Sequence, residues 1–210
     1  PHLGLVAYQP DSAAKTLLMI PNTVWYLFFI SLSVQMFVYC EEDDKKSELV
    51  LLDFTSVPTL HGWSEMSDMI RLIGKSKAVL VLQKTLRFQR AVLFTMLNPQ
   101  PDGAGFAGFR TDREFDLSDY HSLQMMCRGQ GDHFGYKVVL RHWGENTDPF
   151  PSYEHMFQAP MRKFDIVTLP LHHFEAYYRG RKKNNSIPLD KSKISSFELQ
   201  MYGGVYLPVK

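Results

Sequence analysis

The segment LQMMCRGQGDHFGYKVVLR, residues 123–141, decides the fold class. On both sides of its glycine-rich turn, apolar residues take every second position, while Gln124, Arg128, Lys137 and Arg141 stand between them. A period of two over strand-length stretches predicts antiparallel strands with one face toward a core and one toward solvent. The apolar positions are Leu123, Met125, Cys127, Phe134, Tyr136, Val138 and Leu140.

Similar strand patterns lie on both sides of this segment. Residues 49–54, 78–83 and 91–97 are short apolar runs, and Tyr153, His155 and Phe157 alternate with Glu154 and Gln158. Helix is scarce: the best candidate is Ser64–Ile73, where Ser64 or Ser67 could cap the first turn. Together these patterns predict an all-β protein, a sandwich or jelly roll.

Composition narrows the possible partners. The chain has 210 residues, a formal net charge of +1 and 45% hydrophobic residues. Nucleic-acid binding requires a basic face, so this balance argues against it as the main activity. Only Cys40 and Cys127 are present, which excludes a disulfide framework. Cys127 shares the core face of its strand, and we expect a buried, inert thiol.

The stretch Thr16–Cys40 contains no charged residue and is strongly apolar. A secretory signal peptide cleaved near Cys40, an uncleaved membrane anchor and a mitochondrial transit peptide are all considered. The absence of arginine before Arg71 disfavours the transit peptide. We therefore expect an extension over residues 1–40, an acidic spacer over 41–47 and the folded domain over 48–210.

Motifs for catalysis and cofactor binding are weak. Gly103–Gly108 matches G-x-G-x-x-G, but a Pro-rich loop precedes it and a strand pattern follows, so a tight loop entering a packed strand is expected. No G-x-S-x-G elbow is present, and Ser76 is expected to serve a turn. Metal-binding spacings are also missing. We expect a non-enzyme without cofactor or metal; the histidines weighed as ligands are His133, His142, His155, His172 and His173.

Several polar and aromatic residues are candidates for binding. Sugar recognition needs exposed aromatics beside hydrogen-bonding groups, and Trp143, Tyr153, Arg110 and Arg141 could supply them. The basic run at residues 179–183 could instead contact an acidic partner or lipid headgroups. Its candidate residues are Arg179 and Arg181, and Asn184 begins a glycosylation sequon that is usable only in the secretory pathway.

An ordered set of segments resembles a known family. They are Trp63–Asp68, Gly74–Ser76, Gly105–Gly108, Phe115–Tyr120, Arg128–Asp132, Tyr136–Val138, Tyr153–Pro160, Arg179–Arg181 and Pro188–Asp190. This set, from Leu49 to Gly204, is similar to the complex I intermediate-associated protein 30 domain. The resemblance implies a galactose-binding-like jelly roll and a chaperone-like assembly factor for mitochondrial NADH:ubiquinone oxidoreductase. It offers no catalytic residues, and its usual last strand is expected to be missing after Gly204.

Two functions therefore remain open at this stage. The first is a non-catalytic assembly protein whose clients are complex I intermediates in mitochondria. The second is a secreted or endoplasmic reticulum module that binds carbohydrate or protein, with a possible membrane tether through the N-terminal segment. For packing, we expect Trp63 and Phe115 to be largely buried.

Overall fold

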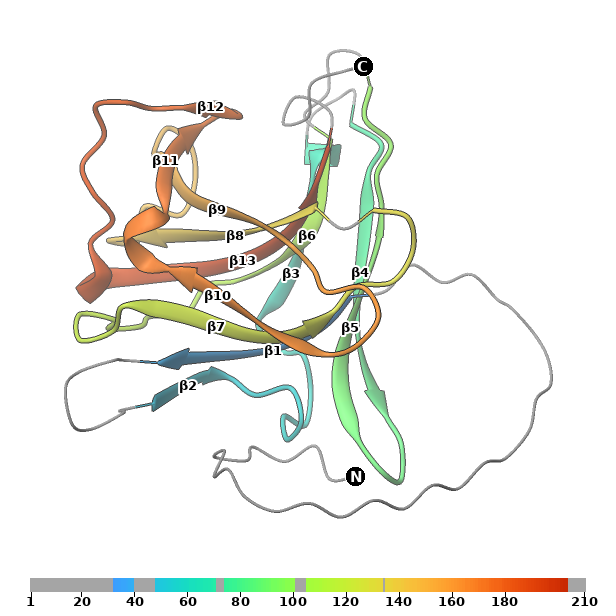
Figure 1. The fold of residues 1–210 in the computed structure, drawn as a ribbon. Coiled ribbons are helices and arrows are strands. Elements are labelled where there is room, and N and C mark those ends of the chain that lie inside the picture. Colours follow the sequence, from blue (N-terminus) through green and yellow to red (C-terminus); the bar gives the residue numbers. More distant parts are fainter. Residues whose placement is uncertain (1–31, 40–47, 71–73, 101–104, 134, 204–210) are drawn as a thin grey trace.

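The computed structural model describes the chain over residues 32–39, 48–70, 74–100, 105–133 and 135–203, with only the backbone described for 32–39. Within these ranges the protein is an all-β sandwich of two antiparallel sheets (Figure 1). Helical structure there is limited to three 3₁₀ turns, η1 (Asp68–Ile70), η2 (Leu171–His173) and η3 (Lys191–Lys193). The all-β prediction is confirmed.

One layer, the β1 sheet, has its strands in the order β10-β7-β1-β5-β4, and β2 also pairs with β1. Its β4–β5 hairpin runs steeply across the direction of β1 and β7 (Figure 1). The strands are β1 (Leu32–Tyr39), β2 (Glu48–Leu52), β4 (Lys77–Lys84), β5 (Gln89–Met96), β7 (Ser122–Arg128) and β10 (Asp165–Pro170).

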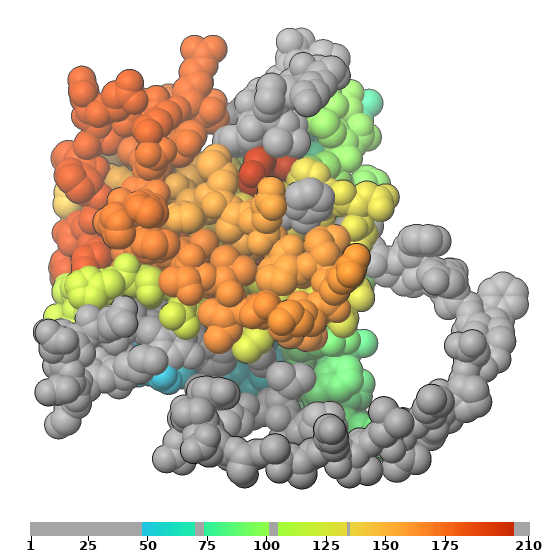
Figure 2. Space-filling view, in the orientation of Figure 1, coloured from blue at the N-terminus to red at the C-terminus, as the bar shows by residue number. Residues whose placement is uncertain are grey.

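The other layer, the β13 sheet, has the order β12-β11-β9-β8-β13-β6-β3. Strand β11 of this sheet and strand β10 of the β1 sheet both belong to the orange segment that covers much of the visible face in the space-filling view (Figure 2). The strands are β3 (Trp63–Ser67), β6 (Phe106–Thr111), β8 (Gly135–His142), β9 (Ser152–Gln158), β11 (Glu175–Tyr178), β12 (Arg181–Lys182) and β13 (Ile194–Tyr202).

The core lies between the two sheets, and the alternation at 123–141 positions it as predicted. On β7, Leu123, Met125 and Cys127 are buried, and the residues between them are half-buried. On β8, Val138 and Leu140 face the core opposite Leu199 and Phe197 of β13. Since side chains alternate between faces, the residues between these core positions, Lys137, Val139 and Glu198, point to the outer face of the sheet.

The second half of the apolar N-terminal stretch is part of the fold. Strand β1 pairs with β7 from Ser33↔Arg128 to Tyr39↔Ser122, and its first residues pair with β5 at Leu93, Val92 and Ala91. The folded domain therefore begins before residue 48, the expected boundary. The rest of the expected extension, residues 1–31, and the acidic spacer lie outside the described residues, as does the end of the chain after Gly203.

The helix expected over Ser64–Ile73 is wrong. Trp63–Ser67 is strand β3, which pairs with β6 from Trp63↔Thr111 to Ser67↔Ala107. Only the single turn η1 follows it, and residues 71–73 lie outside the described part of the chain. The serines had suggested a cap, but tertiary pairing with β6 outweighed this local preference.

Both aromatic residues expected in the core are half-buried and pack against it. The Trp63 ring lies 5.4 Å from that of Phe54 and 6.2 Å from that of Phe197, measured between centroids. Phe115 is held by a backbone bridge to Ile194, the first residue of β13. Both residues therefore cover the edge of the core and are less buried than expected. None of the described helices has the length and apolarity needed to cross a membrane.

We predict that the sandwich requires β1. A chain shortened to residues 41–210 lacks the strand that joins β7 to β5, and we expect it to aggregate or to lose cooperative urea unfolding. A chain shortened to residues 21–210 keeps β1 and is the matched control, which we expect to unfold cooperatively. Equal stability of the two chains would contradict the placement of β1.

We also predict that Cys127 is protected from alkylation. Burial, with a smaller effect from the charge of Asp165, raises the pKa of its thiol to about 12. At pH 8 the reactive thiolate should therefore be about 1,000-fold rarer than in the unfolded chain. Iodoacetamide labelling, followed by mass spectrometry in a Cys40→Ser background, measures this difference. Equal labelling rates with and without urea would contradict the burial of Cys127.

Candidate functional site

A large hollow lies over the outer face of the β13 sheet. It has a volume of about 700 Å³ and is lined mostly by polar and charged side chains. We call it the β13 cleft. Its lining residues are Met66, Phe106, Arg110, Lys137, Val139, Arg141, Asn146, Thr147, Asp148, Ser152, Glu154, Arg179, Gly180, Glu198 and Gln200.

The floor of the β13 cleft follows from strand alternation and register. Lys137 and Val139 are the β8 residues that point away from the core, and they lie opposite Gln200 and Glu198 of β13. On the other side of β8, Val139 lies opposite Glu154 of β9. Three adjacent strands therefore direct their outward side chains into one hollow.

A buried ion pair crosses this floor. The Lys137 Nζ atom lies 2.7 Å from Glu154 Oε2, and the two side chains are only 2% and 5% exposed. Ser152 Oγ donates to the other carboxylate oxygen of Glu154 at 2.9 Å. The Ser152 hydroxyl therefore also helps to fix the Glu154 carboxylate in position. Removing one partner of such a pair is costly because an unpaired charge would remain buried.

Glu198 has unused hydrogen-bonding capacity. Gln200 Nε2 donates to its Oε2 atom, but Oε1 makes no hydrogen bond and lies 3.5 Å from Arg141 Nε, which is also unbonded. Ser196 Oγ, on the same strand face, is a third buried atom without a partner. Burial raises the pKa of Glu198, and the cations Arg141, Arg110 and Lys137 oppose that shift.

Two predicted contact residues stand at the rim of the β13 cleft. Arg110 donates through Nε and Nη2 to Asp112 Oδ1, at 2.8 and 2.6 Å, and through Nη1 to the Asn146 carbonyl at 2.8 Å. Arg179 Nη2 lies 3.2 Å from Asp148 Oδ2 in an exposed pair. Arg110 is therefore fixed in place, while the exposed Arg179–Asp148 pair can exchange partners at little cost.

The other predicted contacts lie elsewhere. Tyr153 faces the core at 2% exposure, and its hydroxyl donates to the Ile187 carbonyl at 2.6 Å. Trp143 is exposed outside the cleft, where its Nε1 donates to Asp190 Oδ2 at 2.7 Å. Arg181 and Asn184 are exposed on and after β12. The β13 cleft thus gathers Arg110, Arg141 and Arg179 but excludes both aromatic residues.

Sequence inspection missed the polar floor. Lys137 and Glu154 were noted only as alternating polar positions, and Glu198 and Gln200 were not singled out. Such positions normally face water. A glutamate within the mostly apolar stretch Ile194–Tyr202 was the available signal, because a charge in a strand buried on both faces requires a partner.

Within the described ranges, no cofactor site is seen at the glycine motif and no metal site at the histidines considered as ligands. Gly105 has a φ of 67° and leads directly into β6, as expected at the end of a loop that enters a packed strand. The preceding residues of the motif, 103 and 104, lie outside the described residues. His155, His172 and His173 lie close together, with ring centroids 6.0 Å apart for His155–His173 and 4.1 Å apart for His172–His173. No group of three potential metal ligands is found among the described residues.

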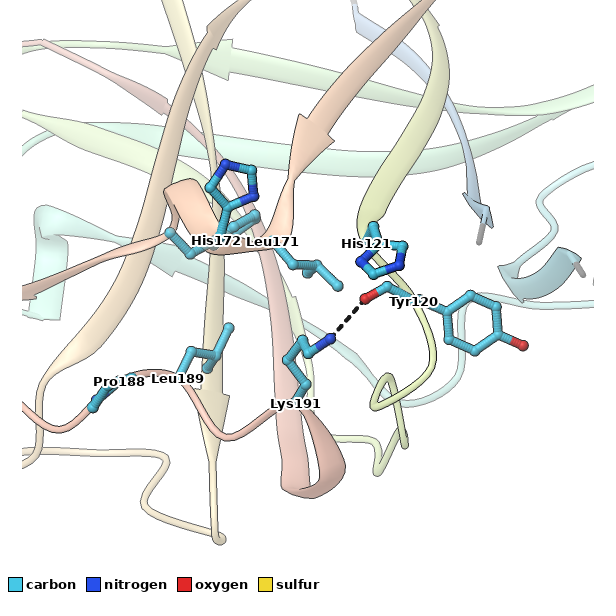
Figure 3. A pocket seen from close by; sticks show the side chains of 8 residues that line it. Tyr120, His121, Leu171, His172, Pro188, Leu189 and Lys191 are labelled. Carbon is cyan, nitrogen blue, oxygen red and sulfur yellow. Dashed lines mark hydrogen bonds between the residues drawn. The ribbon is translucent and has the colours of Figure 1, made fainter. Parts of the chain in front are cut away.

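A second hollow, of about 320 Å³, lies at the end of β10 beside η2 (Figure 3). Leu171, Phe174 and Leu189 make it mainly apolar. The amine of Lys191 donates to the carbonyls of Ser118 and Tyr120, at 2.9 and 2.8 Å. The half-buried Lys191 of this hollow is thus already engaged, and the β13 cleft offers more open polar groups.

Comparison with known structures supports the fold. The family 11 carbohydrate-binding module from Clostridium thermocellum, solved with a beta-1,3-1,4-mixed-linked tetrasaccharide, superposes with a TM-score of 0.54 at 11% identity. The match covers 80% of this chain and 87% of that module. At this identity the likeness shows a shared jelly-roll sandwich and nothing more.

Comparison with known sequences identifies the family. An uncharacterized protein of Schizosaccharomyces pombe, C9E9.15, is 28% identical over 108 residues, a match that spans 47% of this chain and about half (49%) of that relative. The family model for complex I intermediate-associated protein 30 matches residues 52–208, which include every described strand except β1 and most of β2. The chain therefore belongs to the complex I intermediate-associated protein 30 family.

Proposed function

We propose that this chain is a non-catalytic assembly protein that holds a polar segment of a protein client in the β13 cleft. The observation that carries the proposal is a set of buried polar atoms on one sheet face that make no hydrogen bond: Ser196 Oγ, Glu198 Oε1 and Arg141 Nε, the last two forming an ion pair at 3.5 Å. Buried polar groups are normally hydrogen-bonded, so a partner that supplies both donors and acceptors would stabilise this face.

The chemistry of the cleft suits binding better than catalysis. Lys137 and Glu154 neutralise each other, and Arg110 is engaged by Asp112 and Asn146. A general acid or base needs a proton that it can exchange with substrate. Groups held in mutual pairs on a rigid sheet instead provide fixed donors and acceptors, which favour recognition of a defined polar segment.

Family membership supplies the class of client. The complex I intermediate-associated protein 30 family is associated with assembly of mitochondrial complex I, so we infer that an assembly intermediate of that complex is the client. The position of β1 supports a mitochondrial location. Cleavage of a signal peptide near Cys40 would remove a strand that pairs with both β5 and β7.

The Asn184 sequon provides an independent check of location. Asn184 is exposed, so a glycan would be sterically possible if the chain entered the endoplasmic reticulum. Under the mitochondrial proposal, glycosidase treatment leaves the mobility of the expressed chain unchanged. A mobility shift that disappears in an Asn184→Gln variant would instead favour the secretory alternative.

We predict that blocking the mouth of the β13 cleft abolishes client capture. Thr147 is exposed at the rim, and Thr147→Trp places an indole across the opening without removing a buried contact. Arg179→Asn removes a rim guanidinium, and Asn tolerates the positive φ of 50° at that position. We expect capture of complex I intermediates from solubilised mitochondria to fall at least about tenfold for each variant.

The matched control is Thr168→Trp, which adds the same indole to an exposed position on β10, in the other sheet. Its capture should equal that of the unmodified chain. Undiminished capture by the Thr147→Trp chain, with normal melting, would contradict the assignment of the β13 cleft.

Carbohydrate is the second candidate ligand. The same unpartnered atoms could bind sugar hydroxyls, and the solved module of similar fold is a carbohydrate-binding module. Neither aromatic residue expected to bind sugar lines the cleft, however, because Tyr153 faces the core and Trp143 lies outside. The aromatic residue that does line it, Phe106, is half-buried, and Lys137 Nζ lies 5.9 Å from its ring centroid. Calorimetric titration with a mixed-linked β-glucan oligosaccharide separates the candidates. Saturable heat that is lost in Thr147→Trp would favour carbohydrate.

We predict that the two charges of the ion pair on the floor are energetically coupled. Lys137→Met leaves Glu154 buried without its cation, and we expect a loss of about 3–5 kcal/mol in the free energy of unfolding. The double change Lys137→Met with Glu154→Met removes both charges and should regain most of that loss. Urea unfolding measures both variants. A single variant as stable as the double would show that the pair is not coupled.

A further inference from the structure

The β4–β5 hairpin has an unusual composition for a solvent-exposed element. Residues 77–96 contain no aspartate or glutamate, but they include Lys77, Lys84, Arg87 and Arg90. They also carry several of the exposed large apolar side chains found among the described residues. These are Val79 at 54% exposure, Val81 at 36%, Leu86 at 107% and Met96 at 56%.

The tip of this hairpin is ordered and presents Leu86 outward. Thr85 N donates to the Phe88 carbonyl at 2.9 Å, and Thr85 Oγ1 accepts from the backbone of Arg87 and Phe88. The turn lies beyond the ends of the other labelled strands of its sheet (Figure 1). Leu86 is therefore held away from the sandwich by a fixed turn, with Lys84 and Arg87 close to it in sequence.

Beside the hairpin, two guanidinium groups face a hollow of about 390 Å³ that is floored by Val81, Val92 and Phe94. The groups belong to Arg90 and Arg128, and both lie over the ring of Phe164, 5.8 and 5.0 Å from its centroid. Arg128 Nε is buried without a hydrogen-bond partner. Burial and the charge of Arg128 lower the pKa of Arg90.

Among the described residues, this cluster has no acidic ion-pair partner. Over the described ranges, no ion pair within 4.0 Å involves Arg87, Arg90 or Arg128. Arg90 Nε donates only to the neutral Gln83, at 2.7 Å. Two like charges beside an apolar floor repel each other unless an anion lies between them, and guanidinium groups match the geometry of phosphate oxygens.

We propose that this surface, formed by Val79, Val81, Leu86, Arg87, Arg90 and Arg128, docks on the headgroups of an anionic lipid bilayer. We call it the hairpin surface. Leu86 enters the boundary between headgroups and acyl chains, where a fully exposed apolar side chain is stabilised. The arginines bind lipid phosphates, and each basic residue near an anionic leaflet adds to the attraction.

A bilayer fits these observations better than an acidic protein segment does. A protein partner would need a pocket that receives the projecting Leu86, whereas the lipid interface accepts any apolar tip. The absence of acidic residues over residues 77–96 also removes the repulsion that an anionic membrane would otherwise cause. The hairpin surface lies on the β1 sheet, so it does not overlap the β13 cleft and does not depend on the proposed function.

Sedimentation with vesicles tests the proposal on the full chain. The probe is a vesicle of phosphatidylcholine with one-fifth phosphatidylglycerol, compared with pure phosphatidylcholine. We expect Arg87→Glu to weaken binding about 20-fold, because it reverses one charge near the leaflet. Leu86→Ser should weaken it about tenfold through loss of the inserted side chain. Pure phosphatidylcholine should bind weakly.

Two matched controls make comparable substitutions at exposed positions away from the hairpin surface. Lys193→Glu makes the same charge change at an exposed position on η3, and Ile187→Ser removes an apolar side chain that is 63% exposed. Both should bind vesicles like the unmodified chain. An equal loss in Lys193→Glu and Arg87→Glu would refute the hairpin surface as the site. Unchanged vesicle binding together with reduced client capture in the hairpin variants would assign the surface to a protein and overturn the proposal.

Discussion

The pairing of β1 with β5 and β7 is the constraint on which the rest of the sandwich depends. Strand β1 joins two otherwise separate pieces of one sheet, β10–β7 and β5–β4. Leu93 of β5 and Leu123 and Met125 of β7 are almost fully buried, so both pieces supply the same core. That core supports the inner face of the β13 sheet. The cleft on the outer face is therefore held in shape by a strand in the opposite layer.

Alternate residues of strand β13 contribute to the core and to the cleft. Phe197, Leu199 and Met201 pack on the core side, while Glu198 and Gln200 point into the cleft. Burying such charges is costly, and hydrophobic side chains of similar volume at the same positions would often be at least as stable. The presence of these polar side chains is explained if they bind a ligand in the cleft. A sheet fixes its side chains more rigidly than a loop does, so the donors and acceptors are pre-organised before a ligand arrives.

The sequence predicted the class of fold because alternation in Leu123–Leu140 reports burial directly. It failed where local pattern and tertiary context conflict. The serines near Ser64 suggested a capped helix, yet Trp63–Ser67 pairs with β6 as strand β3. The targeting role expected for the uncharged run before Cys40 stays a prediction, although its last residues, Leu32–Tyr39, form a central strand of the β1 sheet. Of the contact residues proposed from residue type, Arg110, Arg141 and Arg179 line the β13 cleft. Their separation from Tyr153 required the register of β9, which places that ring toward the core.

The low net charge of +1 bears on how the two outer faces act together. A nearly neutral protein has little long-range attraction to an anionic surface, since fields are screened beyond about 8 Å at physiological salt. Contact then depends on local clusters, and the cations near Leu86 have no acidic neighbours in the hairpin. The β13 cleft, by contrast, balances its cations with Glu154 and Glu198. Local charge would thus orient the molecule with the β1 sheet toward an anionic surface and the cleft away from it, free to hold a client.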